Sequence, residues 1–256
     1  MSDLLTSGRL TISPVGAHLT SADTTHGELF YLSSTSRYGV GESIRGGVPV
    51  IAPWFADLLG LEPKHGWARR SEWDTGTGKG GFRASLTRDG LALQLLGIEL
   101  SDGVHLQLSA ANESDETKTV QLAFHPYFAV SDVAEISVRG LDGVDVLDRL
   151  TGQASRQKGD ITFDGEFDRI ALGTPEVTIV DRDRTITVTP DGTDSTVVWN
   201  PGAELADTLP DIGPGEWQRF VCVEPALLGA RQRGVELAPG EDLQLGMTVS
   251  ASGTGS

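Results

Sequence analysis

Two segments of the chain end an apolar run with a titratable side chain that is followed by proline. In residues 120–128 alternate apolar residues share one face of an expected strand, so His125 lies on the opposite face, where a proline ends the pairing. Residues 220–223 lead in the same way to Glu224. Either side chain alone is typical of a solvated strand end. Together, an imidazole and a carboxylate can act as general acid and general base.

A second group of residues concentrates positive charge. Residues 44–55 contain paired glycines and two prolines, which fix an irregular backbone, and residues 64–70 follow shortly afterwards. The cations of these two stretches are Arg45, Lys64, Arg69 and Arg70. Acidic residues are interspersed with them. From spacing alone, a structural crossover with ordinary surface charges is therefore favoured over an anion site.

Other patterns that suggest chemistry are incomplete. Residues 76–81 satisfy G-x-G-x-x-G, but the residues that follow alternate like a strand and not like a helix, so they predict a glycine-rich hairpin turn and no nucleotide site. The five histidines are scattered, with no pair at metal-ligand spacing, so no metal is expected. Cys222 is the single cysteine and has no partner within the chain for a disulfide.

Composition excludes several classes of protein. The 256 residues include 36 acidic and 20 basic side chains, so the formal net charge is −16. Such a charge repels nucleic-acid phosphates and anionic membranes, and neither is expected as a partner. The N-terminal residues lack the basic and apolar parts of a signal peptide, and no window has the roughly 20 apolar residues of a membrane span. A cytoplasmic location is expected.

Most of the chain alternates between apolar and polar residues with the period of a strand. Residues 104–110 and 243–249 show this most clearly, and the other short strand-like runs are 120–124, 136–138, 177–180, 185–188, 196–199 and 220–223. The only apolar stretch with helical character is residues 54–61. The pattern predicts an all-β protein, a large antiparallel β-sandwich. We expect one domain over residues 1–256, with a frayed tail from about residue 250.

Six blocks in this order resemble the glucose-6-phosphate 1-epimerases, or hexose-6-phosphate mutarotases, of the galactose-mutarotase-like superfamily. The blocks are IRGGVPVIAPWF (44–55), HGWAR (65–69), FHPYFAVSD (124–132), FDGEFDRIAL (163–172), VVWNPG (197–202) and FVCVEPA (220–226). The resemblance implies a β-supersandwich and a role for each matching position. It makes His125 the general acid and Glu224 the general base, and it implies that Asp168 holds sugar hydroxyls.

The same resemblance gives the basic residues a task. It implies that Arg45 and Arg69 contact the phosphate, and that His65 binds the sugar or orients the acid. Lys64 departs from the family pattern and is expected to retune the anion site. Pro126 and Phe167 are two further departures, which leave the acid and the aspartate in place.

The activity implied is interconversion of the α and β anomers of a hexose 6-phosphate, with glucose 6-phosphate as the expected substrate. It requires one acid, one base and no cofactor. A small-molecule sugar phosphate is the expected partner, and the protein is expected to be a monomer. Two alternatives stay open: an aldose 1-epimerase for unphosphorylated sugars, and a non-catalytic carbohydrate-binding module. The carboxylates of Glu224 and Asp168 are expected to favour the charged form of His125.

Overall fold

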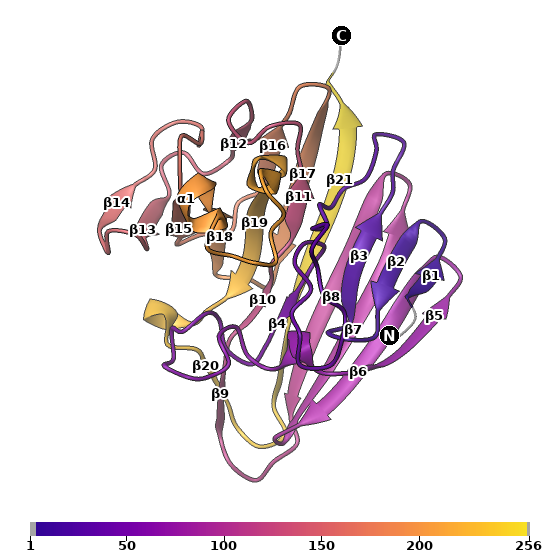
Figure 1. The fold of residues 1–256 in the computed structure, drawn as a ribbon. Coiled ribbons are helices and arrows are strands. Elements are labelled where there is room, and N and C mark those ends of the chain that lie inside the picture. Colours follow the sequence, from indigo (N-terminus) through magenta and orange to yellow (C-terminus); the bar gives the residue numbers. More distant parts are fainter. Residues whose placement is uncertain (1–3, 255–256) are drawn as a thin grey trace.

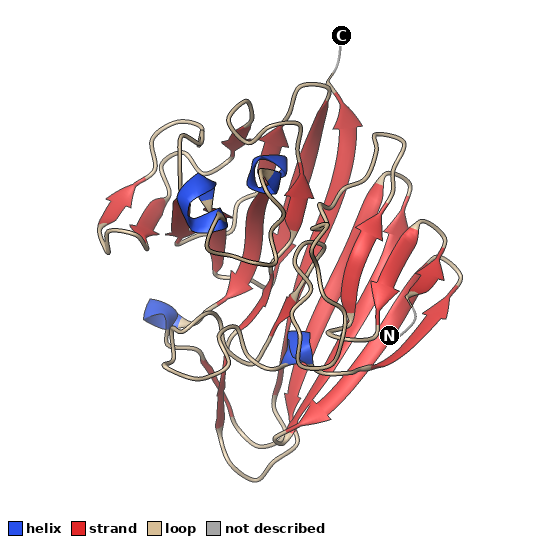
Figure 2. Cartoon of the chain, in the orientation of Figure 1, coloured by secondary structure: helices blue, strands red, loops and turns tan. Residues whose placement is uncertain are grey.

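The computed structural model describes residues 4–254, and strands dominate it (Figures 1 and 2). One large sheet, called sheet I here, has the strand order β14-β13-β15-β18-β19-β10-β4, and β11 also pairs with β19. Its strands are β4 (Val50–Ile51), β10 (Leu122–Phe124), β11 (Tyr127–Ala129), β13 (Asp145–Asp148), β14 (Ala154–Arg156), β15 (Phe167–Ala171), β18 (Ser195–Asn200) and β19 (Phe220–Leu227).

The second large sheet, sheet II, has the order β12-β16-β17-β21-β8-β7-β6-β5. Its strands are β5 (Asp74–Gly78), β6 (Gly81–Arg88), β7 (Leu91–Leu100), β8 (Gly103–Asn112), β12 (Ser137–Arg139), β16 (Val177–Val180), β17 (Arg184–Asp191) and β21 (Asp242–Gly253). The strand pairings in both sheets are antiparallel. The predicted all-β antiparallel sandwich is confirmed.

Smaller elements complete the described part of the chain. A three-stranded sheet lies in front of sheet II in Figure 1, and a two-stranded ribbon extends below. These strands are β1 (Leu5–Ser7), β2 (Leu10–Ser13), β3 (His18–Ala22), β9 (Lys118–Val120) and β20 (Val235–Leu237). The helices are short: α1 (Gly202–Ala206) and the 3₁₀ turns η1 (Ala68–Arg70), η2 (Glu216–Arg219) and η3 (Ala230–Gln232). None of the described helices is long and apolar enough to cross a membrane.

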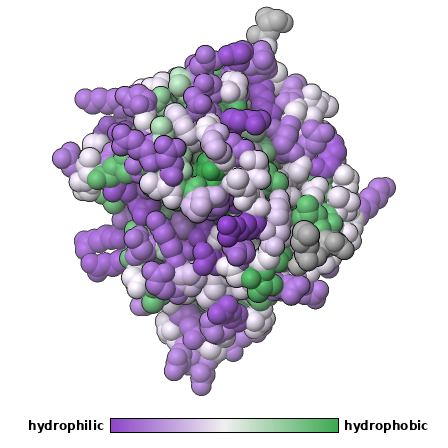
Figure 3. Space-filling view, in the orientation of Figure 1, coloured by the Kyte–Doolittle hydropathy of each residue, from purple (hydrophilic) through white to green (hydrophobic). Residues whose placement is uncertain are grey.

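The main hydrophobic core lies between the two large sheets. Sheet II contributes alternate residues such as Leu106 and Leu108 of β8, and sheet I contributes Phe124, Val221 and Val223. Burying side chains of this size stabilises the fold by about 1.5–3 kcal/mol each. Polar residues cover most of the face shown in Figure 3, where hydrophobic areas are small and separate.

Sheet I is also covered on its second face. In β19, Cys222 packs with Tyr31 and Tyr127, while its neighbours Val221 and Val223 point into the main core. Since both faces are covered, seven of the eight residues of β19 are buried. Such a strand has no solvated side, which explains why residues 220–223 form a continuous apolar run instead of alternating. The second face is where the titratable side chains converge.

The structure corrects one expectation about local structure, the frayed tail, and confirms another, the hairpin turn. Residues 54–61 form turns and no helix, because Ala56 has a positive φ of 49° and the N–H of Phe55 donates to the side chain of Gln121. The tail is ordered further than expected: β21 continues to Gly253 and pairs with β17, whereas residues 255–256 lie outside the described part. Residues 76–81 form the expected hairpin turn, between β5 and β6.

Candidate active site

The second face of sheet I carries a cavity of about 290 Å³, near the lower end of the size range of small-ligand sites. All seven residues singled out from the sequence line it. They are Arg45, Lys64, His65, Arg69, His125, Asp168 and Glu224. They come from segments that are far apart in the chain. The fold therefore gathers the catalytic and the basic candidates around one space.

Strand register accounts for the meeting of the carboxylates and the histidine. Asp168 of β15 lies opposite Trp199 of β18, and Trp199 lies opposite Cys222 of β19. Glu224 is two residues beyond Cys222 and so shares its face. His125 follows the last residue of β10, the neighbour of β19 on the other side. Its Nε2 lies 3.5 Å from Oε1 of Glu224.

Glu224 does not end its strand, which corrects the sequence prediction. β19 continues through Pro225 to Leu227, with Pro225 opposite Thr196 of β18. On the other side, β10 pairs with residues 226–227 and β11 begins again opposite residue 222, so residues 223–225 have no registered partner there. A proline is tolerated in the sheet because the ladder is interrupted at that point. The same interruption brings the imidazole of His125 to Glu224.

Burial sets the protonation of this pair. Burial, and next the negative charge of Asp168, raise the pKa of Glu224 well above its usual value. Burial, and next the cations Arg69 and Arg45, lower the pKa of His125 well below its usual value. The expected charging of His125 by neighbouring carboxylates is therefore wrong for the empty site. Desolvation and the guanidinium groups outweigh it, and the proton is favoured on Glu224.

Three buried polar atoms around the pair have no hydrogen-bond partner: Nδ1 of His125, Oε2 of Glu224 and Oδ1 of Asp168. Buried polar atoms are normally paired, so these atoms mark a place for a polar ligand. Asp168 is held through its other oxygen by Nη1 of Arg149, at 3.2 Å. Burial, the largest effect, raises the pKa of Asp168 despite that cation.

Aromatic rings wall the cavity. The ring of His125 stacks on Tyr127 with centroids 4.9 Å apart, and it meets Trp199 edge-on at 5.7 Å. His65 contacts His125 edge-on at 5.4 Å. Nδ1 of His65 accepts a bond from the N–H of Ala56 at 3.3 Å, so a neutral His65 carries its proton on Nε2. Burial, followed by the charge of Arg69, lowers the pKa of His65 and favours that neutral form.

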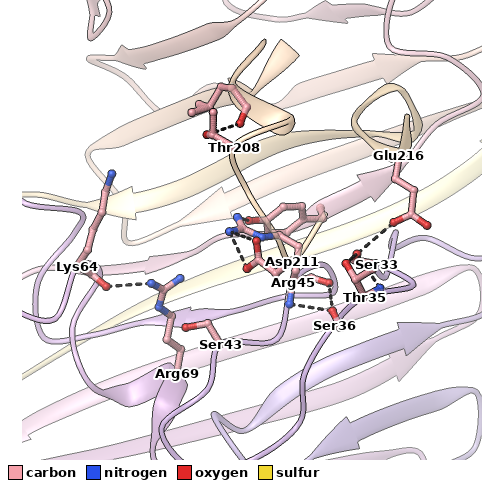
Figure 4. A network of polar contacts seen from close by, with 12 residues as sticks. Ser33, Thr35, Ser36, Ser43, Arg45, Lys64, Arg69, Thr208, Asp211 and Glu216 are labelled. Carbon is pink, nitrogen blue, oxygen red and sulfur yellow. Dashed lines mark hydrogen bonds and ion pairs between the residues drawn. The ribbon is translucent and has the colours of Figure 1, made fainter. Parts of the chain in front are cut away.

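The basic residues Arg45, Lys64 and Arg69 line the cavity and are called its basic end here; Figure 4 shows their polar contacts. Arg45 donates through Nη1 to the hydroxyl of Tyr127 at 2.9 Å and through Nη2 to Asp211 at 3.0 Å. Arg69 donates through Nη2 to the carbonyl of Lys64 at 2.9 Å. The Nε atoms of both arginines are buried without a partner. The side chain of Lys64 extends away from both guanidinium groups in this view.

Glycines and a buried histidine support the loop that presents Arg45. Gly46 has a φ of 106°, and a Cβ there would lie 2.3 Å from the carbonyl oxygen of Tyr31. Nε2 of His18 lies 2.7 Å from the carbonyl oxygen of Gly46 and donates to it. Gly66, in the second basic stretch, has a φ of 72° and a Cβ there would lie 2.0 Å from the oxygen of Ala52. Only glycine fits both positions.

Sequence reasoning missed four residues of this region: Tyr127, Arg149, Trp199 and Asp211. A signal existed for Tyr127, which lies two residues after His125 and so on the same face. Trp199 stands inside one of the six matching blocks but had no role assigned to it. Arg149, which follows β13, and Asp211, in the loop after α1, stand outside all six blocks, and nothing in their spacing relates them to the cavity.

The site also brings a thiol close to the acid and base. Ligand atoms of His125, Cys222 and Glu224 lie within 4.8 Å of one another. Burial, with the nearby charge of Glu224, raises the pKa of the Cys222 thiol. Three larger hollows, of about 670, 820 and 500 Å³, lie elsewhere on the described part of the surface and have no histidine in their walls.

Known proteins share both the sequence and the fold. A protein of Cenchrus ciliaris with the provisional name glucose-6-phosphate 1-epimerase is 30% identical over 264 residues, which is 92% of this chain and 79% of that protein. A protein of Escherichia coli K12 with the same provisional name is 31% identical over 255 residues, covering 88% of this chain and 81% of that one.

A solved structure has a similar fold. The crystal structure of YeaD from Salmonella typhimurium, provisionally described as a mutarotase, superposes with a TM-score of 0.85 at 25% identity and covers 98% of this chain and 90% of that one. The family model described as aldose 1-epimerase matches residues 5–250. The family expected from the six blocks is thereby confirmed, and the chain belongs to the aldose 1-epimerase family.

Proposed function

We propose that the protein interconverts the α and β anomers of a hexose 6-phosphate, with glucose 6-phosphate as the substrate. One observation carries the proposal. A buried imidazole and carboxylate 3.5 Å apart share a cavity with Arg45, Arg69 and Lys64. The first two groups suit acid–base chemistry on a sugar ring, and the cations suit a phosphate. The relatives that bear the name glucose-6-phosphate 1-epimerase support the choice of substrate.

The reaction needs one base and one acid that act on two oxygens of the same carbon. Glu224 removes the proton of the anomeric hydroxyl while His125 protonates the ring oxygen, and the C1–O5 bond breaks to give the open aldehyde. After rotation about C1–C2, the ring closes on the other carbonyl face. The proton then returns from Glu224 to the sugar, and His125 takes up the one that leaves. Each positioned group contributes about 10²- to 10⁴-fold.

Substrate binding prepares the pair for this role. In the empty site burial, and next the guanidinium groups of Arg69 and Arg45, lower the pKa of His125. A phosphate dianion placed against these arginines offsets their charge, and the imidazolium becomes easier to form. Asp168 and the Nε2–H of His65 are placed to hold sugar hydroxyls, and Arg149 fixes the carboxylate of Asp168.

The proposed activity needs one cavity, and residues of one chain line it. The main core draws on residues from Leu10 to Ala251, and one chain supplies an acid, a base and three cations to the cavity. We therefore propose one domain over residues 1–256 that works as a monomer. We also propose a cytoplasmic location, with which the single free Cys222 agrees. Sedimentation of the purified protein at assay concentration tests the monomer, and a dimer would contradict it.

Exchange NMR on glucose 6-phosphate and on glucose, at equal concentration and pH, tests the function. We expect exchange between the anomers of glucose 6-phosphate well above the spontaneous rate, and much slower catalysis on glucose. Equal catalysis on both sugars would favour an aldose 1-epimerase for free sugars, with structural arginines. No catalysis on either sugar, together with binding, would favour a carbohydrate-binding module.

A further inference from the structure

The two arginines at the basic end of the cavity are not equally available. Both carboxylate oxygens of Asp211 lie beside Nη2 of Arg45, at 3.0 and 2.9 Å, and the hydroxyl of Tyr127 occupies Nη1. Arg69 has no carboxylate within ion-pair distance among the described residues. In Figure 4, Asp211 lies directly against the guanidinium of Arg45, whereas Arg69 contacts only a backbone carbonyl.

The contact between Asp211 and Arg45 leaves one donor unused. Nε and Nη2 form the edge of a guanidinium that binds a carboxylate or phosphate with two parallel hydrogen bonds. Asp211 uses only Nη2, and Nε of Arg45 remains buried without a partner. An anion with three oxygens, seated on this edge, would satisfy both donors. Asp211 therefore satisfies only one of the two donors on this edge of Arg45, and a phosphate in its place could satisfy both.

Asp211 lies in a segment that borders the cavity. It lies between α1 and η2, and two residues of the same region, Leu205 and Leu209, line the cavity. Its side chain is 25% exposed, so solvent can take up the carboxylate when it leaves Arg45. A phosphate ester carries nearly two negative charges, and like charges against one guanidinium repel each other.

We propose that Asp211 holds the phosphate position on Arg45 in the empty enzyme and is displaced when the substrate's phosphate binds. This inference rests on the proposed function for the identity of the substrate. Asp211 then acts as an internal competitor: it neutralises a buried arginine that would otherwise be unpaired, and it sets the affinity for phosphorylated sugars. It is a specificity-determining residue that takes no part in proton transfer.

Asp211→Asn tests the inference, because the amide has the same shape and lacks the charge. Asp207→Asn is the matched control, since Asp207 is an exposed aspartate of the same region. We expect Asp211→Asn to bind inorganic phosphate about tenfold more tightly than the parent in calorimetric titration, and to lower KM for glucose 6-phosphate by more than it changes kcat. Asp207→Asn is expected to match the parent.

Weaker or unchanged phosphate binding by Asp211→Asn would overturn the inference, since Asp211 would then support Arg45 instead of competing for it. A crystal structure with inorganic phosphate gives a second measurement. Phosphate on the Nε–Nη2 edge of Arg45 with Asp211 turned away supports the inference, and phosphate bound with Asp211 still on Nη2 overturns it. The titration and the crystal structure use phosphate alone, so both stay valid even if exchange assays refute the proposed substrate.

Discussion

The eight residues of strand β19 point alternately to two faces of the sheet, and the two faces have different roles. Val221 and Val223 point into the core between the sheets, where they contact apolar side chains from both. Cys222 and Glu224 point to the other face, where a buried carboxyl group meets an imidazole. Both sets are equally buried. Burial at one face therefore stabilises the fold, whereas burial at the other shifts pKa values and leaves polar atoms without partners.

The difference shows why burial alone does not identify a core residue. A buried polar atom without a partner costs about 1–3 kcal/mol. Of the seven such atoms among the described residues, three lie on His125, Asp168 and Glu224 of the second face, and two more belong to Arg45 and Arg69 in the same cavity. The hydrophobic core stabilises the fold enough to offset this cost. The unpaired polar atoms of the second face are free to form hydrogen bonds with a polar ligand.

Changing neighbouring residues that point to opposite faces of β19 separates the effects of the two faces. Glu224→Gln removes the ionisable group but keeps its shape, so exchange of glucose 6-phosphate should fall by about 10²- to 10⁴-fold. Its stability should change little, because the raised pKa of Glu224 means that the folded site already favours an uncharged side chain. Exchange NMR and urea unfolding measure the two effects. Near-normal exchange in Glu224→Gln would refute its role as the base.

Val223→Ala is the matched control on the core face of the same strand. It leaves a cavity in the main core, so the free energy of unfolding should fall by about 2 kcal/mol. Exchange per folded molecule should stay close to that of the parent, since Val223 does not line the site. A loss of activity as large as in Glu224→Gln would show that the core face of β19 also determines activity.

The core face of this strand is predictable from sequence in a way that the second face is not. Alternation places Val221 and Val223 on one side and Glu224 on the other, whatever the pairing. The meeting of Glu224 with His125 depends on the register of β10 and β19 and on the interruption of the ladder beside Pro225. The register between these two strands depends on contacts between residues far apart in the chain, and no local pattern in either segment determines it.

The basic end shows the same limit. Six blocks in order were enough to expect the family fold and to choose Arg45 and Arg69. No feature of the sequence indicated that Asp211, which is 166 positions away from Arg45, would hold its guanidinium. The glycines of the Arg-Gly-Gly stretch were recognisable as irregular backbone, and the close approach of the carbonyl of Tyr31 to Gly46 gives the reason.

A smaller effect is expected from the cations, which hold the phosphate and transfer no proton themselves. Arg69→Ala should lower kcat/KM for glucose 6-phosphate by about 10- to 150-fold, the equivalent of about 1.5–3 kcal/mol for a charge-assisted hydrogen bond. Exchange on free glucose should not fall, because glucose has no phosphate for Arg69 to hold and the loss of this cation makes the imidazolium of His125 easier to form. Arg69→Lys should recover part of the loss, since it restores the charge without the planar fork.

Arg70→Ala controls for the general loss of positive charge. Its guanidinium binds Ser43 at 2.8 Å and is not part of the cavity lining, so kcat/KM for either sugar should stay near that of the parent. Equal losses on both sugars in Arg69→Ala would mean that this arginine supports the backbone of the site, and the preference for phosphorylated sugars would need another source.

The smallest effect concerns a buried histidine that belongs to neither face. His18 on β3 donates to the carbonyl of Gly46, and burial lowers its pKa to about 4. The unfolded chain takes up this proton near pH 6.5, before the folded protein does, so stability is lost as the pH falls through that range. His65 and His125 act in the same direction, whereas the raised pKa values of Glu224 and Asp168 oppose it. His18 alone should contribute a loss of about 2 kcal/mol between pH 7 and 5.

His18→Gln keeps a donor for Gly46 and has no proton to gain, so its unfolding free energy should fall by about 2 kcal/mol less than that of the parent over this interval. Parallel stability curves for the two proteins in urea unfolding would show that His18 takes up its proton as readily in the folded protein as in the unfolded chain. The loop that carries Arg45 would then depend on its glycines and not on an imidazole that must remain neutral.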